Sequence, residues 1–136
     1  MNVGVVIVTH YRLGEEFLHA LRLIVPDARN FHAVSIDPGQ SVDEMRGSIE
    51  KALSEAEAGE GVLVLTDMFG GTPSNIALSF LDKRRVEVVT GVNLPMLIKL
   101  ASLREARPLE ELAVLVKDYG RRNISVAREL LPEEGA

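Results

Sequence analysis

A histidine directly after an apolar, β-branched run is the first residue of the chain suited to nucleophilic chemistry. His10 follows the letters VGVVIVT, and Asp67 follows a second apolar run, VLVLT. An imidazole reacts through one ring nitrogen when a hydrogen bond to the other nitrogen fixes its tautomer. Asp67 is the candidate acceptor of that hydrogen bond. The two residues therefore predict a nucleophilic histidine that a carboxylate orients.

The loop after Asp67 holds two glycines and a threonine in front of Pro73. Glycine lets backbone N–H groups approach an anion closely, and a helix start favours negative charge. We therefore predict Gly70, Gly71 and Thr72 as phosphate-binding residues, with Thr72 as the N-cap of a helix that has Pro73 in its first turn. A phosphoryl group on His10 would find these donors beside it, so the site is predicted to carry phosphohistidine.

The elements that must position these residues alternate along the chain. Apolar or alternating runs predict strands, and spacing of three and four residues predicts the helices between them. Ser41 and Glu44 form a capping box ahead of one helix, Pro108 opens another, and Gly120 is predicted to end it. The predicted strands are residues 3–8, 31–36, 62–66 and 86–90.

This alternation predicts a single α/β domain over residues 1–136, with a doubly wound, mostly parallel four-stranded sheet. We expect the strand order 2-1-3-4, although the alternation alone does not fix it. Ligands of such sheets bind beyond the carboxyl ends of the strands. His10 and Asp67 follow strands one and three, so they meet at that edge if these strands are neighbours.

Composition limits the classes of function. The chain has 136 residues, a net charge of −5 and no cysteine, which excludes disulfides and thiolate sites and argues against nucleic-acid binding. The N-terminal apolar run lacks a basic leader and ends too early for a signal peptide or a membrane span. We therefore predict a cytoplasmic protein without membrane insertion.

The other histidines are predicted to be structural. His19 falls off the apolar stripe of its helix and should be solvated, whereas His32 lies near the start of strand two, away from the site. No third ligand accompanies His10 and Asp67, so neither a metal nor a cofactor is predicted.

Three segments together resemble a known family: VVIVTH at residues 5–10, VLVLTDMFGGTPSNIA at 62–77 and TGVNLPML at 90–97. The chain is similar, over nearly its whole length, to the mannose-type (mannose/fructose/sorbose) enzyme IIA domain of the bacterial phosphoenolpyruvate-dependent sugar phosphotransferase system. The resemblance implies that His10 accepts a phosphoryl group from the phosphocarrier protein HPr and donates it to a IIB protein. It also implies that Asp67 orients His10 and that Thr72 lies near the phosphoryl group.

The resemblance further implies a homodimer that exchanges a C-terminal antiparallel strand, which would suit residues 123–130. Tyr11 departs from the family, which usually has glycine or a small residue after the histidine. Met68 and Phe69 stand in the variable part of the loop. These departures bear on the choice of partner more than on the nucleophile or its acid.

Other interpretations stay open. The chain could be a regulatory IIA protein whose phosphorylation controls a partner, or the phosphotransfer subunit of a dihydroxyacetone kinase. A flavodoxin-like nucleotide binder is disfavoured because no P-loop or G-x-G-x-x-G follows strand one. Residues 94–103 predict an apolar helix that is either core or a subunit interface. Ile124 and Val126 suit a short strand, and a frayed helix is the competing interpretation.

Overall fold

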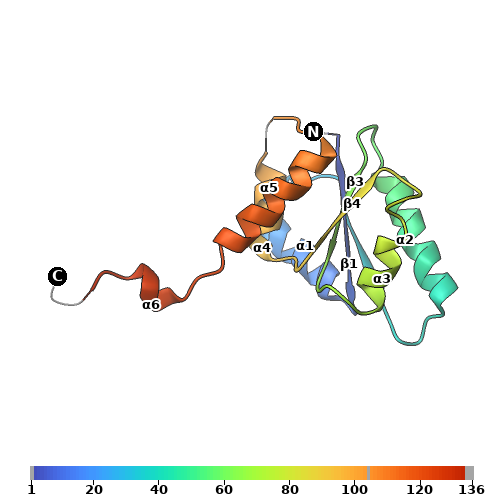
Figure 1. Cartoon of the computed structure of the whole chain (residues 1–136), viewed down its shortest axis with the longest axis horizontal. Coiled ribbons are helices and arrows are strands. Elements are labelled where there is room, and N and C mark those ends of the chain that lie inside the picture. The colour runs from blue at the N-terminus through green and yellow to red at the C-terminus, as the bar shows by residue number, and fades with distance from the viewer. Residues whose placement is uncertain (1, 104, 134–136) are drawn as a thin grey trace.

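A sheet of four parallel strands forms the centre of the computed structural model, which describes residues 2–103 and 105–133 (Figure 1). The strands are β1 (Gly4–His10), β2 (Phe31–Ile36), β3 (Val62–Thr66) and β4 (Val86–Thr90), in the order β2-β1-β3-β4. The predicted fold class and strand order are confirmed. Because all four strands are parallel, their carboxyl ends share one edge of the sheet, and β1 and β3 are its central pair.

Strand β1 is longer than the apolar pattern predicts. It continues through Thr9 and His10, because these residues pair with Ser35 and Ile36 of β2. On its other side β1 pairs with β3 as far as Thr66. The last residue of β1 and the first residue after β3 therefore end at the same edge.

Three helices cover one face of the sheet: α1 (Leu13–Ile24), α4 (Leu94–Ser102) and α5 (Leu109–Arg122) (Figure 1). Helix α4 packs against both α1 and α5, so its predicted role in the core is confirmed and its role as an interface stays a prediction. Burying a large aliphatic side chain fully stabilises the fold by about 1.5–3 kcal/mol. The fully buried large side chains on this face include Ile7, Leu21, Leu65, Leu97, Leu109 and Leu112.

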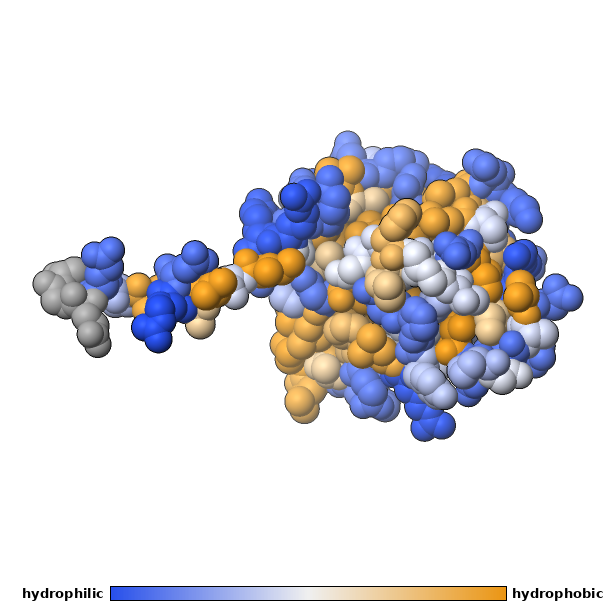
Figure 2. Space-filling model, turned by 60° about the horizontal axis from the view of Figure 1, so that its bottom comes forward, coloured by the Kyte–Doolittle hydropathy of each residue, from blue (hydrophilic) through white to orange (hydrophobic). Residues whose placement is uncertain are grey.

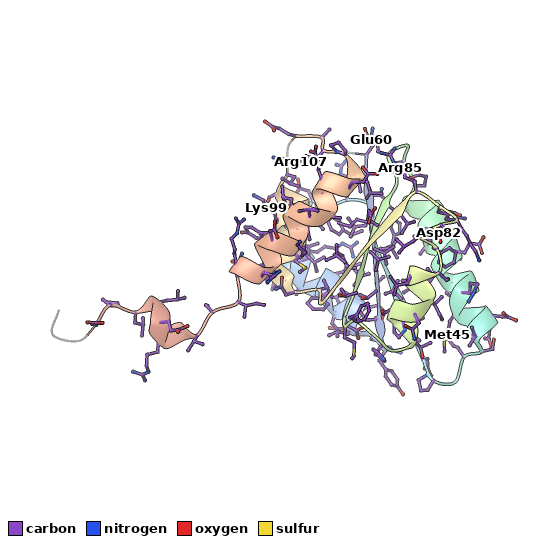
Figure 3. The ribbon with its side chains drawn as sticks, viewed as in Figure 1. Met45, Glu60, Asp82, Arg85, Lys99 and Arg107 are labelled. Carbon is purple, nitrogen blue, oxygen red and sulfur yellow. The ribbon has the colours of Figure 1, made fainter. Side chains whose placement is uncertain are left out.

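Two helices, α2 (Val42–Ala56) and α3 (Thr72–Leu78), cover the other face. The predicted capping box begins α2: the Ser41 hydroxyl accepts from the Glu44 N–H at 3.1 Å, and the Glu44 carboxylate accepts from the Ser41 N–H at 3.1 Å. Side chains fill the space between the sheet and both helical layers (Figure 3).

Two predicted helix boundaries are wrong. Helix α3 begins at Thr72, and its N-cap is Gly71, whose positive φ of 84° suits glycine, so Thr72 is not the cap. Gly120 does not end α5, which continues to Arg122. A Cβ at Gly120 would overlap the side chain of Met96, so this glycine serves the close approach of α5 to α4.

The C-terminal segment leaves the body of the molecule after α5 (Figure 1). Residues 124–126 have no regular structure, and α6 (Ala127–Leu130) is a single turn with no buried residue. A short helix is therefore present in the single chain, and the exchanged strand stays a prediction. Over the residues described, every helix is too short or too polar to traverse a lipid bilayer.

Gly4 offers a test of how tightly β1 packs against α2. A Cβ there would overlap the backbone carbonyl of Ala56, which cannot move as a side chain can. We expect Gly4→Ala to lower the free energy of unfolding by about 1–3 kcal/mol, measured by urea denaturation.

Gly47→Ala is the matched control, because Gly47 is exposed within α2 and has nothing within 4 Å of an added Cβ. It should raise the free energy of unfolding by about 0.5–1 kcal/mol through helix propensity. Equal effects of the two substitutions would contradict the packing at Gly4.

Candidate active site

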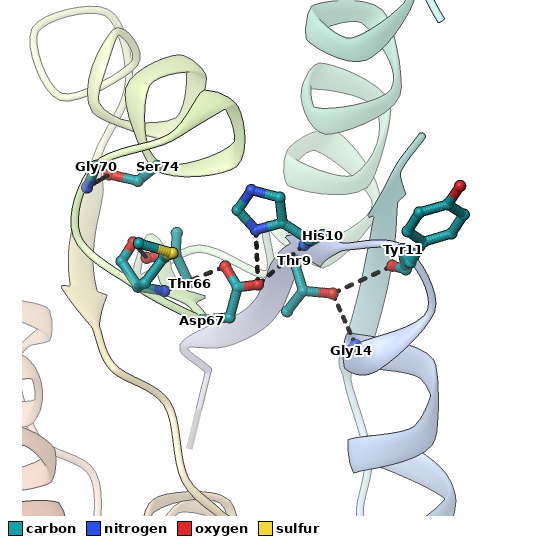
Figure 4. A network of polar contacts seen from close by, with 9 residues as sticks. Thr9, His10, Tyr11, Gly14, Thr66, Asp67, Gly70 and Ser74 are labelled. Atoms are coloured by element: carbon teal, nitrogen blue, oxygen red, sulfur yellow. Dashed lines mark hydrogen bonds and ion pairs between the residues drawn. The ribbon is translucent and has the colours of Figure 1, made fainter. Parts of the chain in front are cut away.

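The carboxylate of Asp67 holds His10 at two atoms (Figure 4). Its Oδ2 accepts the backbone N–H of His10 at 3.0 Å and lies 2.9 Å from the ring Nδ1. Its Oδ1 accepts the N–H of Met68 at 3.1 Å. The side chain of Asp67 is only 12% exposed, so the carboxylate is fixed between the ends of β1 and β3.

The geometry assigns different roles to the two ring nitrogens. A carboxylate oxygen can only accept, so Nδ1 is the nitrogen that donates to Asp67, and in the neutral ring this tautomer leaves the lone pair on Nε2. The side chain of His10 is 49% exposed, so Nε2 can meet a reactant from outside. The structure thus brings together the predicted nucleophile and its orienting acid.

Buried hydroxyl groups shape the two loops that meet at His10. Thr9 Oγ1 accepts the N–H of Gly14 at 2.8 Å and donates to the carbonyl of Tyr11 at 3.3 Å (Figure 4). Thr66 Oγ1 donates in the same way to the carbonyl of Met68, also at 3.3 Å. Each threonine stands near the end of a central strand and bonds two residues ahead, which fixes the chain as it leaves the sheet.

The glycine loop after Asp67 touches the histidine ring. A Cβ on Gly71 would lie 3.2 Å from Cε1 and 3.3 Å from Nε2 of His10, so it would crowd the ring, and the positive φ of 84° also favours glycine here. The N–H of Gly70 donates to the hydroxyl of the buried Ser74 at 3.2 Å, and an added Cβ on Gly70 would meet nothing within 4 Å. Gly71 is therefore beside Nε2 of His10, whereas the Gly70 N–H is used within the loop.

Sequence reasoning missed Thr9, Thr66 and Ser74. Among the residues described, these three are the buried polar side chains, and all three lie at the carboxyl edge of the sheet. For Thr9 and Thr66 the sequence gives only a weak indication of this role, namely a threonine at the end of an apolar strand. Nothing local marks Ser74, because its partner becomes apparent only when the loop is folded.

The other histidines lie away from the site. His19 is exposed on α1 and close to Glu16, and His32 Nε2 lies 2.8 Å from the side-chain oxygen of Asn30. Both line a depression of about 330 Å³ beside β2. Another depression, of about 220 Å³, is lined by Glu60, Arg85 and Arg107 at the end of the sheet opposite His10 (Figure 3).

A comparison with known protein families shows to which family the chain belongs. The family model EIIA-man, described as "PTS system fructose IIA component", matches residues 4–117, which include the whole site. The chain belongs to the EIIA-man family. This finding confirms the family resemblance that the three sequence segments indicate.

Relatives of the EIIA-man chain carry names from the sugar phosphotransferase system. The fructose-specific EIIA component of Bacillus subtilis is 34% identical over 110 residues, 80% of this chain and 75% of that protein. The mannose-specific EIIAB component of Escherichia coli K12 is 29% identical over 138 residues. The alignment covers the whole of this chain but only 43% of that relative's length.

A solved structure shares the fold of this EIIA-man chain. The mannose/sorbose specific IIA subunit from Enterococcus faecalis superposes with a TM-score of 0.86 and 29% identity, and the match covers 98% of each chain. The parallel sheet with helices on both faces is thus the fold of that IIA subunit as well.

Gly71→Ala tests whether the glycine loop keeps Nε2 of His10 reactive. The added methyl group meets the ring, and the φ of +84° adds strain. We expect the rate of His10 modification by diethyl pyrocarbonate, followed by mass spectrometry, to fall by about tenfold, because the added methyl group crowds the approach of the reagent to Nε2.

Gly70→Ala is the control, since its φ of +88° gives the same backbone strain while the methyl group meets nothing within 4 Å. It should leave the modification rate of His10 within about twofold of the wild type. The assignment would be wrong if both variants slowed the reaction equally.

Proposed function

We propose that this chain is the IIA phosphoryl carrier of a sugar phosphotransferase system, active in the cytoplasm. It accepts a phosphoryl group from phospho-HPr on Nε2 of His10 and passes the group to a IIB protein. The observation that supports this most directly is the contact of Asp67 Oδ2 with Nδ1, because it leaves Nε2 as the nucleophile. Membership in the EIIA-man family supports the choice of donor and acceptor.

The proposed transfer needs only the groups at this edge. The lone pair of Nε2 forms a bond to phosphorus while the bond between phosphorus and the departing nitrogen of HPr breaks in line with it. The ring of His10 becomes positive, and the Asp67 carboxylate 2.9 Å from Nδ1 stabilises that charge. Return of the electron pair to Nε2 as the phosphoryl group passes to IIB completes the cycle without a cofactor or metal.

Gly71 and Thr72 are the proposed binding residues for the phosphoryl oxygens. Gly71 lies against Nε2, and Thr72 follows it as the exposed first residue of α3. Gly70 supports them by shaping the loop through Ser74. A half-exposed histidine on the surface also suits a donor that is itself a protein, because such a partner must bring its phosphoryl group to Nε2 from outside.

The transfer is tested with enzyme I, HPr and radiolabelled phosphoenolpyruvate. We expect the wild-type chain to take up about one acid-labile phosphate per chain, and His10→Ala to take up none, because the accepting nitrogen is gone. His19→Ala is the control and should be labelled like the wild type, since His19 is exposed on α1 away from the site. Label retained by His10→Ala would refute the assignment.

The chain is also proposed to form a homodimer through its C-terminal segment. Ile124, Val126, Leu130 and Leu131 are each more than 60% exposed on a segment that extends from the body (Figure 1). Strand β4 is an edge of the sheet, and beside it Val88, Ala113 and Val114 help to line a depression of about 290 Å³. An edge strand and an apolar segment both gain from pairing with a second copy.

Light scattering tests the dimer. We expect the full chain at micromolar concentration to have a mass of about twice 14.9 kDa, and a variant that ends at Arg122 to be monomeric because it lacks the exposed apolar segment. Far-ultraviolet circular dichroism checks that the shortened chain is folded. A monomeric full chain would contradict the proposal.

A further inference from the structure

The residue after the nucleophile has an unusual backbone. Tyr11 has a positive φ of 48°, a region that glycine, asparagine and aspartate adopt more readily than tyrosine. Its N–H donates to the carbonyl of Ile36 at 2.9 Å, and its own carbonyl accepts from Thr9. The two strand ends therefore impose this conformation, and the chain tolerates the strain with a large side chain in place.

The side chain of Tyr11 contributes little to the packing of the fold. It is 61% exposed, and its ring lies on the opposite side of His10 from Asp67, directed away from their contact (Figure 4). Neither core cluster of the described residues includes it. Because strain at an active site persists where it serves function, an exposed ring on a strained backbone beside the nucleophile points to an external contact.

Exposed apolar side chains occur in both segments that follow the strand ends at His10 and Asp67. Leu13 is exposed on the side of Tyr11, and Met68 and Phe69 are exposed on the side of Asp67, Phe69 by 73%. Figure 2 shows hydrophobic side chains exposed among polar ones on the face to which the carboxyl ends of the strands are turned. Exposed aromatic and aliphatic side chains grouped around a reactive atom are typical of a protein-docking surface.

We propose that the ring of Tyr11 is an apolar contact for phospho-HPr when this donor docks over Nε2 of His10. The donor surface it fits has an apolar rim around the phosphorylated side chain. This inference rests on the proposed function and adds to it the residue that helps to bind the donor. Tyrosine suits that role because its ring offers a large, rigid contact at low entropic cost.

The experiment measures single-turnover rates of phosphoryl uptake over a range of phospho-HPr concentrations, and here KM is the half-saturating concentration of phospho-HPr and kcat is the maximal rate constant of uptake. Tyr11→Asn removes the ring and keeps a residue that tolerates the left-handed backbone. We expect its KM for phospho-HPr to rise about tenfold while kcat stays within about twofold, because the lost contact binds the partner and does not touch the reacting atoms. Tyr11→Phe keeps the ring and should have both constants within about twofold of the wild type.

The salt dependence of KM and the melting temperature of the variants distinguish an apolar contact from an electrostatic or a structural role of Tyr11. The ratio of KM between Tyr11→Asn and the wild type should be the same at low and high salt, because no charge is removed. The melting temperature of Tyr11→Asn should be at or above that of the wild type, since the backbone strain is relieved. Tyr11→Gly, which also tolerates a positive φ, should repeat the rise in KM.

The outcomes distinguish this inference from the proposed function. If the wild type takes up no label from phospho-HPr, the proposed function fails and the inference falls with it. If the wild type is labelled and Tyr11→Asn and Tyr11→Gly keep its KM, only the inference is overturned. A fall in kcat without a rise in KM would also overturn it, because Tyr11 would then position His10 instead of contacting the partner.

Discussion

The hydrogen bonds of a single carboxylate determine the arrangement of this edge of the sheet. Asp67 follows β3 yet accepts from both the backbone and the ring of His10, the last residue of β1. One side chain therefore links the ends of β1 and β3 and sets how the imidazole is turned. Because both contacts come from the same oxygen, the ring cannot rotate without weakening the link between the two strands. The position of Nε2 beside Gly71 depends on that link.

The support beneath Asp67 and His10 consists of hydroxyl groups instead of further charges. Thr9, Thr66 and Ser74 are fully buried, and each bonds to the backbone of a loop that leaves or reaches the sheet. Buried hydroxyls with satisfied hydrogen bonds hold a loop at modest cost, whereas a buried charge would need a partner of its own. The loops can thus be rigid near His10 while their outer residues stay exposed.

The exposed residues at the carboxyl edge of the sheet form the surface that the proposed partners would contact. The sheet is covered on both faces by helices, so its carboxyl edge remains accessible between α1 and α3 (Figure 1). His10 lies at this edge with large apolar side chains on either side, and Tyr11 is held outward by its backbone. A fixed imidazole among exposed apolar side chains suits the proposed transfer between proteins, where the partner must dock before a phosphoryl group can move.

The sequence by itself determined the parallel sheet and the position of His10 and Asp67 at strand ends, because these follow from the local periodicity of apolar residues and from the direction of parallel strands. The pairing of β1 with β3 makes the two residues neighbours, and it belongs to the tertiary structure because no local pattern sets the order of strands. Tertiary structure decided what depends on close approach between distant segments. From the sequence alone, Gly120 is predicted to end a helix, but in the fold it lies against the side chain of Met96. Ser74 accepts a hydrogen bond from Gly70, and only the fold defines the course of that loop. The local sequence pattern does not predict such contacts. The role of a glycine without a Cβ, or of a buried hydroxyl group, depends on which residues of a distant segment pack against it.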